Sequence, residues 1–327
     1  MPGVLLVVGA SGEQLPSTAA ELAAEGVRLS AALGGPLTAV LAGNGAEPLA
    51  AGLGRLGVER VLVADNQSAL PPSPQWLLAV AEQAARKVEP DVILLTHGGG
   101  TRDLGPSLAY RLDTGIVTDS TALRVEGGEL IITKPVFGGS AIAEFTIRTT
   151  PRVVTLRPRA FEADPNPAPA EAVVEPFAPS LSDADSAIEV LEEVREQATA
   201  GPRLKDARVI VSGGRGLGGA ENWTYVEELA QVLGAAVGAT RAVTDAGWVA
   251  PSLQVGLTGA TVAPDLYITI GISGAVQHIA GISGARNVVA INRDGDANIF
   301  KYARYGVVGD WKQVVPAFTQ RLRELRG

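Results

Sequence analysis

Short apolar runs alternate with amphipathic segments along the first 112 residues. Four runs predict buried strands: GVLLVVG (3–9), LTAVLAG (37–43), RVLVAD (60–65) and DVILLTHGGG (91–100). Apolar positions at helical spacing predict helices at 17–33, 46–54, 73–88 and 102–112. Strands and helices that alternate in this way are typical of right-handed crossovers, so we expect a parallel sheet flanked by helices.

The pattern changes after residue 112. The segment 121–148 has Gly-Gly pairs at 127–128 and 138–139 between runs of alternating polarity. Glycine pairs at such positions are typical of tight turns between antiparallel strands. We therefore expect antiparallel hairpins added to an otherwise parallel domain.

A segment of different composition follows. Residues 157–182 are dense in Pro, Ala and Glu and have no period, which predicts an extended connector. The next stretch, 182–198, predicts a helix capped by Ser182 or Asp183, with acidic residues early in it. We place a domain boundary near residue 201.

Strands and helices alternate again beyond that boundary. The predicted strands are RVIVSGG (208–214), AAVGAT (235–240), LYITIG (266–271) and NVVAIN (287–292). Helices are predicted at 222–233, shortly after Ser273, and at 310–325. The sequence therefore predicts two α/β domains, 1–200 and 201–327, each a largely parallel sheet flanked by helices. A chain of 327 residues is long for one core, which agrees with two domains.

Charge separates the two halves of the chain. The net charge of −8 argues against a general nucleic-acid binder, which needs a basic face for phosphates. Residues 201–327 carry 13 Lys and Arg against 10 Asp and Glu, whereas the rest of the chain is acidic. The second domain is thus the one suited to an anionic ligand.

Cysteine is absent and histidine occurs only twice. The lack of cysteine excludes disulfides and thiolate-bound iron–sulfur or zinc sites, and two distant histidines argue against a histidine metal site. We expect no metal, so redox chemistry must come from an organic cofactor. The chain start has no basic segment before its short apolar run, and no run approaches the length of a membrane span, so we expect a cytoplasmic protein without membrane insertion.

One glycine-rich turn has the spacing of a nucleotide-binding loop. Residues 214–219 read GRGLGG and satisfy GxGxxG between a predicted strand and a helix. An NAD-binding domain places an acid about 20 residues further on, but Thr240 and Arg241 stand there. We interpret the turn as a phosphate loop of another kind, with Arg215 as its charged partner, or as a tight turn without a ligand.

Polar residues follow predicted strands of this domain, where ligands collect in open α/β sheets. Arg241 is either a cation aimed at an anionic cofactor or an ordinary surface arginine. In QVGLTG (254–259), glycines let backbone amides approach a ring system, and Thr258 can donate to a ring nitrogen. The alternative for that segment is a simple turn.

GISGAVQH (271–278) is the strongest candidate for cofactor binding. It contains Ser273, Gly274, Gln277 and one of the two histidines, His278. Ser273 is expected to cap a helix whose N-terminus binds phosphate. A neutral or protonated His278 could hydrogen-bond a flavin carbonyl and stabilise negative charge on reduction, whereas the alternative is a buried histidine bonded within the protein.

Three other polar residues lie at the ends of elements. Asn292 ends a predicted strand, and Asp310 opens the last helix, where its carboxylate can also serve as N-cap. His97 lies in LLTHGGGTRD, which lacks the GK[ST] ending of a Walker loop, so a structural loop is expected. No Ser/His/Asp set or carboxylate pair supports hydrolysis, and we expect no catalytic residue.

Taken in order, SGGRGLG, GATRAVTDAGW, QVGLTG, VAPDLYITIGISGAVQHIAG, VVAINRD and IFKYARYGVVGD resemble the electron transfer flavoprotein alpha subunit. The likeness is close through 208–318 and looser over 1–200. It implies a Rossmann-like domain that binds FAD, a beta subunit that holds AMP, and an electron carrier without its own substrate. The implied donors are acyl-CoA dehydrogenases of fatty acid beta-oxidation or related flavin dehydrogenases, and the implied acceptor is a membrane quinone reductase.

The resemblance also implies roles for individual residues. Arg215 and Ser273 match positions that hold the pyrophosphate. Arg241 matches a cation beside the isoalloxazine, which would favour the reduced, negatively charged flavin. Thr258 matches a hydroxyl that faces the ring nitrogen taking hydride, and His278 a group at the pyrimidine carbonyl.

The adenosine half and the departures from the family involve other residues. Val255 is implied to supply backbone near the flavin, while Asn292 and Asp310 match contacts to the adenosine half. Thr240 replaces the usual Ser and keeps a hydroxyl. Leu257 stands where Gln is common, which removes a polar group beside the flavin, and RDGDANIF replaces the usual KDPEAPIF.

Two other functions stay open from the sequence. A stand-alone NAD- or FAD-dependent oxidoreductase on the same fold needs an acid or base beside the cofactor, and only His278 is present for that role. A nucleotide-binding structural subunit would never change its redox state.

Overall fold

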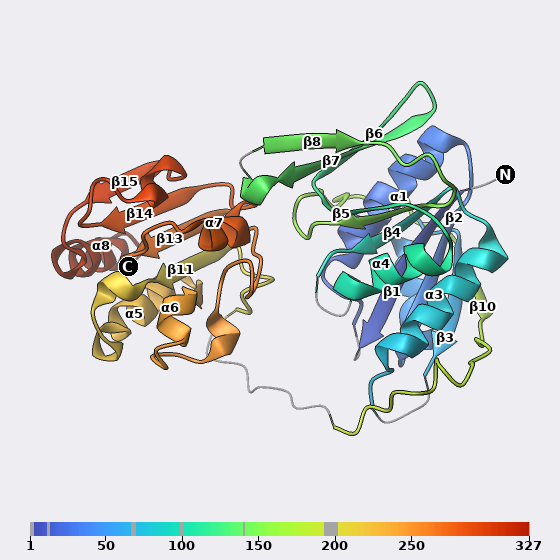
Figure 1. Ribbon diagram of the computed structural model, residues 1–327, viewed down its shortest axis with the longest axis horizontal. Helices are drawn as coiled ribbons and strands as arrows, with labels where there is room; N and C mark the ends of the chain where they lie inside the picture. Colours follow the sequence, from blue (N-terminus) through green and yellow to red (C-terminus); the bar gives the residue numbers. More distant parts are fainter. Residues whose placement is uncertain are drawn as a thin grey trace. The chain divides into compact units, whose positions relative to one another are not determined.

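A computed structural model of the protein describes residues 3–11, 14–66, 70–98, 101–139, 141–192 and 202–326. The chain folds into two compact units, Met1–Pro135 with Ile142–Arg195, and Val136–Ala141 with Glu196–Gly327. Each unit has its own parallel sheet with helices packed on it, which confirms the predicted α/β fold (Figure 1).

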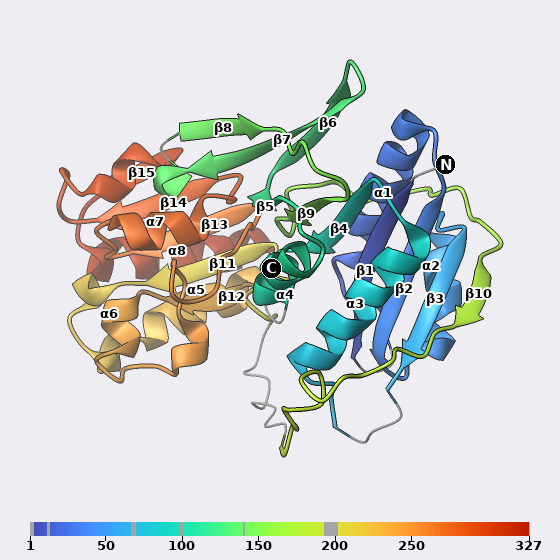
Figure 2. The ribbon, with the colours of Figure 1, turned by 45° about the vertical axis from the view of Figure 1, so that its right-hand side comes forward.

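The first unit is built on a seven-stranded sheet in the order β10-β3-β2-β1-β4-β9-β5, in which all neighbours are parallel. The strands are β1 (Val4–Ser11), β2 (Leu37–Asn44), β3 (Arg60–Asp65), β4 (Val92–Thr96), β5 (Ile116–Ser120), β9 (Arg152–Leu156) and β10 (Val173–Pro176). The helices are α1 (Ala19–Leu33), the 3-10 turn η1 (Glu47–Leu49), α2 (Ala50–Arg55), α3 (Pro74–Val88) and α4 (Thr101–Arg111). Figure 2 shows β3, β2, β1 and β4 side by side with α3 in front of them.

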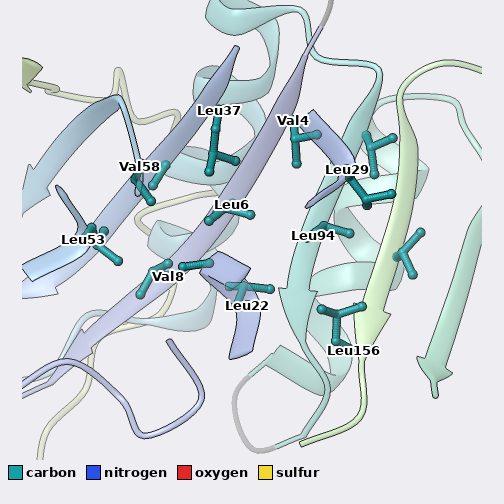
Figure 3. Close-up of a cluster of buried hydrophobic side chains, with 14 of the residues drawn as sticks. Val4, Leu6, Val8, Leu22, Leu29, Leu37, Leu53, Val58, Leu94 and Leu156 are labelled. Atoms are coloured by element: carbon teal, nitrogen blue, oxygen red, sulfur yellow. The ribbon is translucent and has the colours of Figure 1, made fainter. Parts of the chain in front are cut away.

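Successive side chains of a strand point to opposite faces, so this sheet has a core on each side. On one face, Leu22 of α1 and Leu53 of α2 belong to the same buried cluster as Leu6 of β1 (Figure 3). On the other face, Leu108 of α4 is buried in a cluster with Leu5. Burial on both faces explains why the strands read as continuous apolar runs.

A three-stranded sheet of β6 (Ala122–Glu126), β7 (Glu129–Val136) and β8 (Ala141–Phe145) is the predicted antiparallel addition. β6 and β7 pair antiparallel across Gly127 and Gly128, which both have positive φ, as a tight turn between such strands requires. After β7, the short η2 (Phe137–Gly139) groups with the second unit and lies against α7 (Val276–Ile282), which is labelled in Figure 1.

The Pro-rich stretch at 157–182 is irregular except for β10, which adds a parallel edge strand beside β3. Glu175 of β10 accepts from both Arg60 of β3 and Lys87 of α3. These two cations lower the pKa of Glu175 to about 2, so the edge strand is held by charge as well as by backbone pairing.

The prediction of a helix at 182–198 was wrong for the described residues, 182–192. Residues 182–192 form a turn and irregular chain, and 193–198 lie outside the described residues. Ser182 and Asp185 bond each other through side chain and backbone, and Asp185 also pairs with Arg111 of α4 at 2.9 Å. The side-chain bonds that were expected to cap a helix close a local turn instead.

The second unit has a five-stranded parallel sheet in the order β12-β11-β13-β14-β15. The strands are β11 (Val209–Gly213), β12 (Ala236–Ala239), β13 (Leu266–Ile270), β14 (Val288–Asn292) and β15 (Tyr305–Val308). Besides α7, the helical elements are η3 (Arg215–Leu217), η4 (Ala220–Asn222), α5 (Thr224–Leu233), α6 (Arg241–Thr244), η5 (Pro251–Leu253), η6 (Asn298–Lys301) and α8 (Trp311–Arg326). One buried cluster joins α5 and α8 to Val211 and Ile268, and another joins α7 to Ile210 and Tyr267 on the opposite face.

The strand order of this sheet reverses at β11, because β12 lies on one side of it and β13 on the other. Open α/β sheets bind ligands outside the carboxyl ends of their strands at such a point. The loops that follow β11, β12, β13 and β14 all begin at that edge, since the strands are parallel.

Candidate functional site

A cavity of about 800 Å³ lies at the carboxyl edge of the second sheet. Its lining residues lie at or after the ends of β11, β12, β13 and β14, or belong to the loop 254–258. Every predicted cofactor-binding residue except Gly274 and Asp310 lines it. The fold thus brings residues from Arg215 to Asn292 to one place.

Glycines let the loops after β11 and β13 touch beside the cavity. The N–H of Gly216 donates to the carbonyl oxygen of Gly271 at 3.0 Å. A Cβ on Gly214 or on Gly216 would lie 2.4 or 2.7 Å from that oxygen, so neither position has room for a side chain. The glycines of the GxGxxG turn therefore let its backbone contact the loop after β13. The exposed Arg215 of this turn lines the cavity.

Thr240 and Arg241 directly follow β12 and line the cavity. Thr240 Oγ1 is buried and has no hydrogen-bond partner within the described part of the chain. The Arg241 side chain is 68% exposed, and its Nε donates to Oδ2 of Asp245 at 3.2 Å. An exposed pair one helical turn apart contributes only about 0.3–0.5 kcal/mol, so the guanidinium can turn toward a ligand at little cost.

The loop 254–260 is held on two sides. The N–H of Val255 donates to the carbonyl oxygen of Ala239, at the end of β12, at 2.9 Å. On the other side, a Cβ on Gly281 of α7 would lie 2.4 Å from the Cα of Gly256. The loop is therefore fixed between β12 and α7, with its backbone at the cavity.

Side-chain hydrogen bonds connect this loop to α6. Thr244 Oγ1 lies 3.0 Å from Oε1 of Gln254, and Nε2 of Gln254 lies 3.0 Å from Oγ1 of Thr258. Thr244 Oγ1 is also 2.9 Å from the carbonyl oxygen of Arg241. Thr258 is thus joined to α6 through the amide of Gln254.

Leu257 and Gln277 line the cavity with exposed side chains. The N–H of Leu257 donates to the carbonyl oxygen of Gln277 at 2.8 Å. This backbone bond ties the tip of the loop to α7 whatever the side chain at 257. The Leu257 departure therefore changes what faces the cavity and leaves the loop path unchanged.

His278 is buried and bonded through both ring nitrogens. Nδ1 lies 3.1 Å from the carbonyl oxygen of Val255, which can only accept, so Nδ1 carries the proton. Nε2 lies 3.3 Å from the hydroxyl of Tyr267 and accepts its hydrogen, since burial raises the pKa of Tyr267. Burial lowers the pKa of His278 to about 4, against a smaller opposing effect of the bond to Val255, so the ring is neutral at neutral pH. In this arrangement neither nitrogen has a free N–H, and the contact to a flavin carbonyl stays a prediction.

The loop between β13 and α7 differs from the expectation for its serine. Ser273 does not cap α7, because the N-cap is Ala275 and has no side-chain bond. Gly274, at φ 83°, interrupts the helical path before it, and a Cβ there would lie 2.3 Å from the backbone N of Ile299. Gly274 therefore lets the loop pack against the backbone of η6, while the exposed Ser273 lines the cavity.

Asn292 and Asp310 both organise backbone. Nδ2 of Asn292 donates to the carbonyl oxygen of Ile272 at 2.9 Å, and its Oδ1 accepts from the N–H of Asp294 at 3.0 Å. Oδ1 of Asp310 accepts from the N–H of Lys312 at 3.0 Å, which makes it the N-cap of α8. Asn292 lines the cavity, and Asp310 does not.

His97 lies in the first unit, after β4. Its Nδ1 is 2.9 Å from Oγ1 of Thr155 on β9, and burial lowers its pKa. Thr155 Oγ1 also accepts from the N–H of Asp119, whose carboxylate binds Arg157 at 2.7 Å. His97 is thus part of a bonded network at the end of β4 and β9, as expected of a structural loop.

Sequence reasoning missed Gln254 and Asp245, which both line the cavity. Each lies four positions from a predicted residue: Asp245 follows Arg241, and Gln254 precedes Thr258. Polar residues at that spacing meet on a helical turn or across a tight loop, and this spacing is the signal that could have found them.

Two family models match the chain. Residues 203–283 match the Electron transfer flavoprotein FAD-binding domain, and residues 4–182 match the Electron transfer flavoprotein domain. An Electron transfer flavoprotein subunit alpha of Bacillus subtilis is 38% identical over 292 residues, 89% of this chain and 89% of the relative. Its counterpart in Thermoanaerobacterium thermosaccharolyticum is 38% identical over 317 residues, 96% and 95% of the two chains. Protein FixB of Clostridium saccharobutylicum is 38% identical over 315 residues, 95% and 93% of the two chains.

Membrane-spanning helices and metal-binding clusters are both absent from the described residues. No helix there has both the length and the apolar composition needed to cross a membrane. No group of three or more His, Cys, Asp or Glu side chains there is placed to hold a metal ion.

Proposed function

The chain belongs to the family of electron transfer flavoprotein alpha subunits, and on that premise we propose that it carries FAD in a heterodimer with a beta chain. Proteins of this family are electron carriers rather than enzymes that convert a substrate, and the cofactor is FAD. In the proposal, acyl-CoA dehydrogenases or related flavin dehydrogenases donate the electrons, and a membrane quinone reductase accepts them.

The cavity of the second unit is the observation that carries the proposal. Gly214 and Gly216 leave bare backbone at its edge, and Arg215 and Arg241 bring positive charge. Thr240 Oγ1 is buried without a partner among the described residues. An unsatisfied buried hydroxyl costs about 1–3 kcal/mol, which a bond to a ligand oxygen or nitrogen recovers. These residues fit an anionic dinucleotide such as FAD.

The proposed role of each lining residue depends on the loop that carries it. Arg215 and Ser273 are proposed to hold the pyrophosphate, since they lie on the two loops that meet at the reversal of strand order. Arg241 and Thr258 are proposed to face the isoalloxazine, and Asn292 the adenosine half.

Bound FAD supplies a ring that takes up and releases electrons, and the protein sets how readily it does so. Arg241 would stabilise the negative charge that accumulates on reduction, and Asp245 would moderate it, because the two side chains are paired. His278 is proposed to lie at the pyrimidine edge as a neutral group, since its pKa is about 4.

The remaining parts of the proposal concern partners. The first unit is proposed to pair with the beta chain, which would hold AMP, and the complex is placed in the cytoplasm. Neither nucleic acid nor membrane insertion enters the proposal.

An absorbance spectrum of the chain purified with its beta chain tests the proposal. We expect flavin bands that bleach when a donor dehydrogenase and its acyl-CoA substrate are added, and that return when an electron acceptor is added. A complex without flavin absorbance would contradict the assigned cofactor. Bands that bleach with the acyl-CoA substrate alone, without a dehydrogenase, would favour the stand-alone oxidoreductase.

A further inference from the structure

We propose that Gln254 is a positioning residue that sets the direction of the Thr258 hydroxyl, so that this hydroxyl can donate to the flavin in one redox state and accept in the other. The inference rests on the proposed function, in which Thr258 faces the isoalloxazine, and it takes the facing atom to be N5, the ring nitrogen that takes hydride. Gln254 itself acts only through Thr258.

Thr244, Gln254 and Thr258 form a chain of hydrogen bonds that can be arranged in two ways. Thr244 has one hydroxyl hydrogen but two acceptors in reach, the Arg241 carbonyl oxygen at 2.9 Å and Oε1 of Gln254 at 3.0 Å. A glutamine amide has two ends of nearly the same shape, one donating and one accepting. The same heavy-atom positions therefore allow two hydrogen-bond arrangements, which differ by a half-turn of the amide.

In the first arrangement, Thr244 donates to Oε1 of Gln254, and Nε2 donates to Oγ1 of Thr258. The Thr258 hydrogen is then left to point into the cavity. In the second arrangement, Thr244 donates to the Arg241 carbonyl, Nε2 donates to Thr244, and Thr258 donates to Oε1. Thr258 then presents a lone pair to the cavity.

Both arrangements satisfy their buried groups. The Arg241 carbonyl oxygen keeps a bond in either one, because it also accepts from the N–H of Asp245 at 2.8 Å. The amide of Gln254 uses its oxygen and one N–H in each case. The first arrangement has two bonds among these groups and the second has three, so a ligand that accepts from Thr258 supplies the third bond of the first arrangement and can select it.

The backbone of Gln254 stays in place while the amide turns. Its N–H donates to the carbonyl oxygen of Pro251 at 3.0 Å, and its carbonyl accepts from Ala260 at 2.7 Å. Gly259 packs against the same carbonyl, where a Cβ would lie at 2.4 Å. Only the side chain can respond to the ligand.

The two arrangements match the two forms of the flavin nitrogen. Oxidised N5 has a lone pair and needs a donor, whereas reduced N5 carries a hydrogen and needs an acceptor. Thr258 alone could rotate its hydroxyl to accept from reduced N5, but its own hydrogen would then have no acceptor on Gln254, whose Nε2 is a donor. With Gln254 beside it, Thr258 keeps a partner in both.

The test uses the complex with the beta chain, loaded with FAD that carries ¹⁵N at N5. The ¹⁵N resonance is measured in the oxidised and reduced states for wild type, Thr258→Val and Gln254→Glu. The carboxylate of Gln254→Glu only accepts, so Thr258 must donate to it in both states. We expect the oxidised resonance of this variant to shift in the direction seen for Thr258→Val and further than the added charge alone shifts it, while the reduced resonance shifts only as far as the charge shifts it.

The matched control is Gln277→Glu, which adds the same charge at the cavity without a bond to Thr258. A charge acts on both redox states, so equal shifts in both for Gln254→Glu, as in the control, would overturn the inference. An unshifted resonance in Thr258→Val would also overturn the inference. The proposed function would still stand in that case, because FAD would be bound. A complex that binds no FAD would overturn the proposed function and the inference together.

If Gln254→Glu does not retain FAD, Gln254→Met provides the second measurement. Removal of either member of the Gln254–Thr258 pair should weaken FAD binding about 3- to 10-fold, as expected for one hydrogen bond. We expect the double variant with Thr258→Val to lose less than the product of the single losses, because the two residues act as a unit. Fully multiplicative losses would overturn the inference. Gln231→Met, on the exposed side of α5, should leave the affinity unchanged.

Discussion

Arg241 and His278 line the same cavity, but only Arg241 brings a charge to it at neutral pH. Arg241 is exposed and permanently charged, and Asp245 is its near partner. His278 is buried, with a pKa of about 4, and is uncharged at neutral pH. Positive charge near a bound flavin therefore comes from arginine and not from histidine.

Replacement of Arg241 should make the flavin harder to reduce. Arg241→Ala removes the cation proposed to lie beside the ring, so reduction should become less favourable by roughly 1 kcal/mol, as for one exposed charge pair. A potentiometric titration of the FAD-loaded heterodimer measures this change. Arg321→Ala, on α8, removes an exposed cation that pairs with Glu324 and should leave the midpoint where it is. An unchanged midpoint in Arg241→Ala would contradict the role proposed for that residue.

Stability of the second unit should fall as the pH drops from about 6.5 to about 4. The pKa of His278 is lowered in the fold to about 4, so its contribution is complete above the unfolded pKa of about 6.5 and is lost as pH falls toward the folded one. The loss reaches up to roughly 3 kcal/mol. Urea unfolding followed by Trp fluorescence at several pH values measures it.

His278→Gln provides the comparison, because glutamine does not titrate. Over the same pH interval its unfolding free energy should change less than that of wild type. Identical pH dependence in the two proteins would contradict the neutral, buried histidine. His97→Gln is the matched variant in the first unit, where burial also lowers the histidine pKa.

The sequence predicted several of the residues that line the cavity, but it did not predict their hydrogen-bond partners. Arg241 and Thr258 could be identified because polar side chains after a strand or between glycines have few structural reasons to be there. Gln254 could not, because its contact with Thr258 depends on how the loop 254–260 closes. One of the two helix caps predicted in the second domain was right and the other was wrong. Asp310 caps α8, whereas Ser273 does not cap α7, because the chain turns at Gly274, which has positive φ, before the helix begins.

At the scale of elements, the contact between the loop 254–260 and α7 decides the geometry of the site. Gly256 and Gly281 touch backbone to backbone, and Leu257 is tied to Gln277. We therefore expect the loop and the helix to move together. Since both line the cavity, a shift of α7 would displace Thr258.

Gly281→Ala should separate these two elements. Its added Cβ would meet the Gly256 backbone at 2.4 Å, and backbone cannot yield as a flexible side chain does. We expect a loss of about 1–3 kcal/mol in the stability of the second unit, together with weaker FAD binding. Chemical denaturation and FAD titration measure the two effects. Ser283→Ala, at the exposed end of the same helix, should change stability by less than about 0.5 kcal/mol. A Gly281→Ala protein as stable as wild type would contradict the close contact.

Element types were predictable wherever apolar spacing was regular. The strands β1 to β4 and β11 to β14 and the main helices follow from it, since strands buried on two faces must be apolar throughout, whereas β5, β9 and β15 were not predicted. The helix at 182–198 had helical spacing as well, but Ser182, Asp185 and Arg111 use local and long-range bonds to hold a turn in its described part. β10 was not foreseen either, because a proline-rich edge strand needs only one paired side.

The whole molecule consists of two units with separate cores. No buried cluster of the described residues contains members of both units. All residues that line the cavity belong to the second unit. A ligand of the cavity should therefore stabilise that unit directly.

FAD should raise the unfolding free energy of the second unit selectively. Binding to the folded form alone adds about 2.7 kcal/mol when free FAD is a hundred times its dissociation constant. Variants that keep only Trp76 or only Trp223 report on the first and second units in turn. We expect the denaturation midpoint to rise with FAD in the Trp223 protein and to change little in the Trp76 protein. Equal shifts in both would mean that the units unfold together.

The short turn η2 bears on how the chain can be divided. Residues 137–139 come from the middle of the sequence, between β7 and β8, yet they group with the second unit and pack against α7. The second unit is therefore not a contiguous stretch of the gene. A protease cut or a truncation near residue 201 would therefore give a fragment of the second unit that lacks the segment Val136–Ala141.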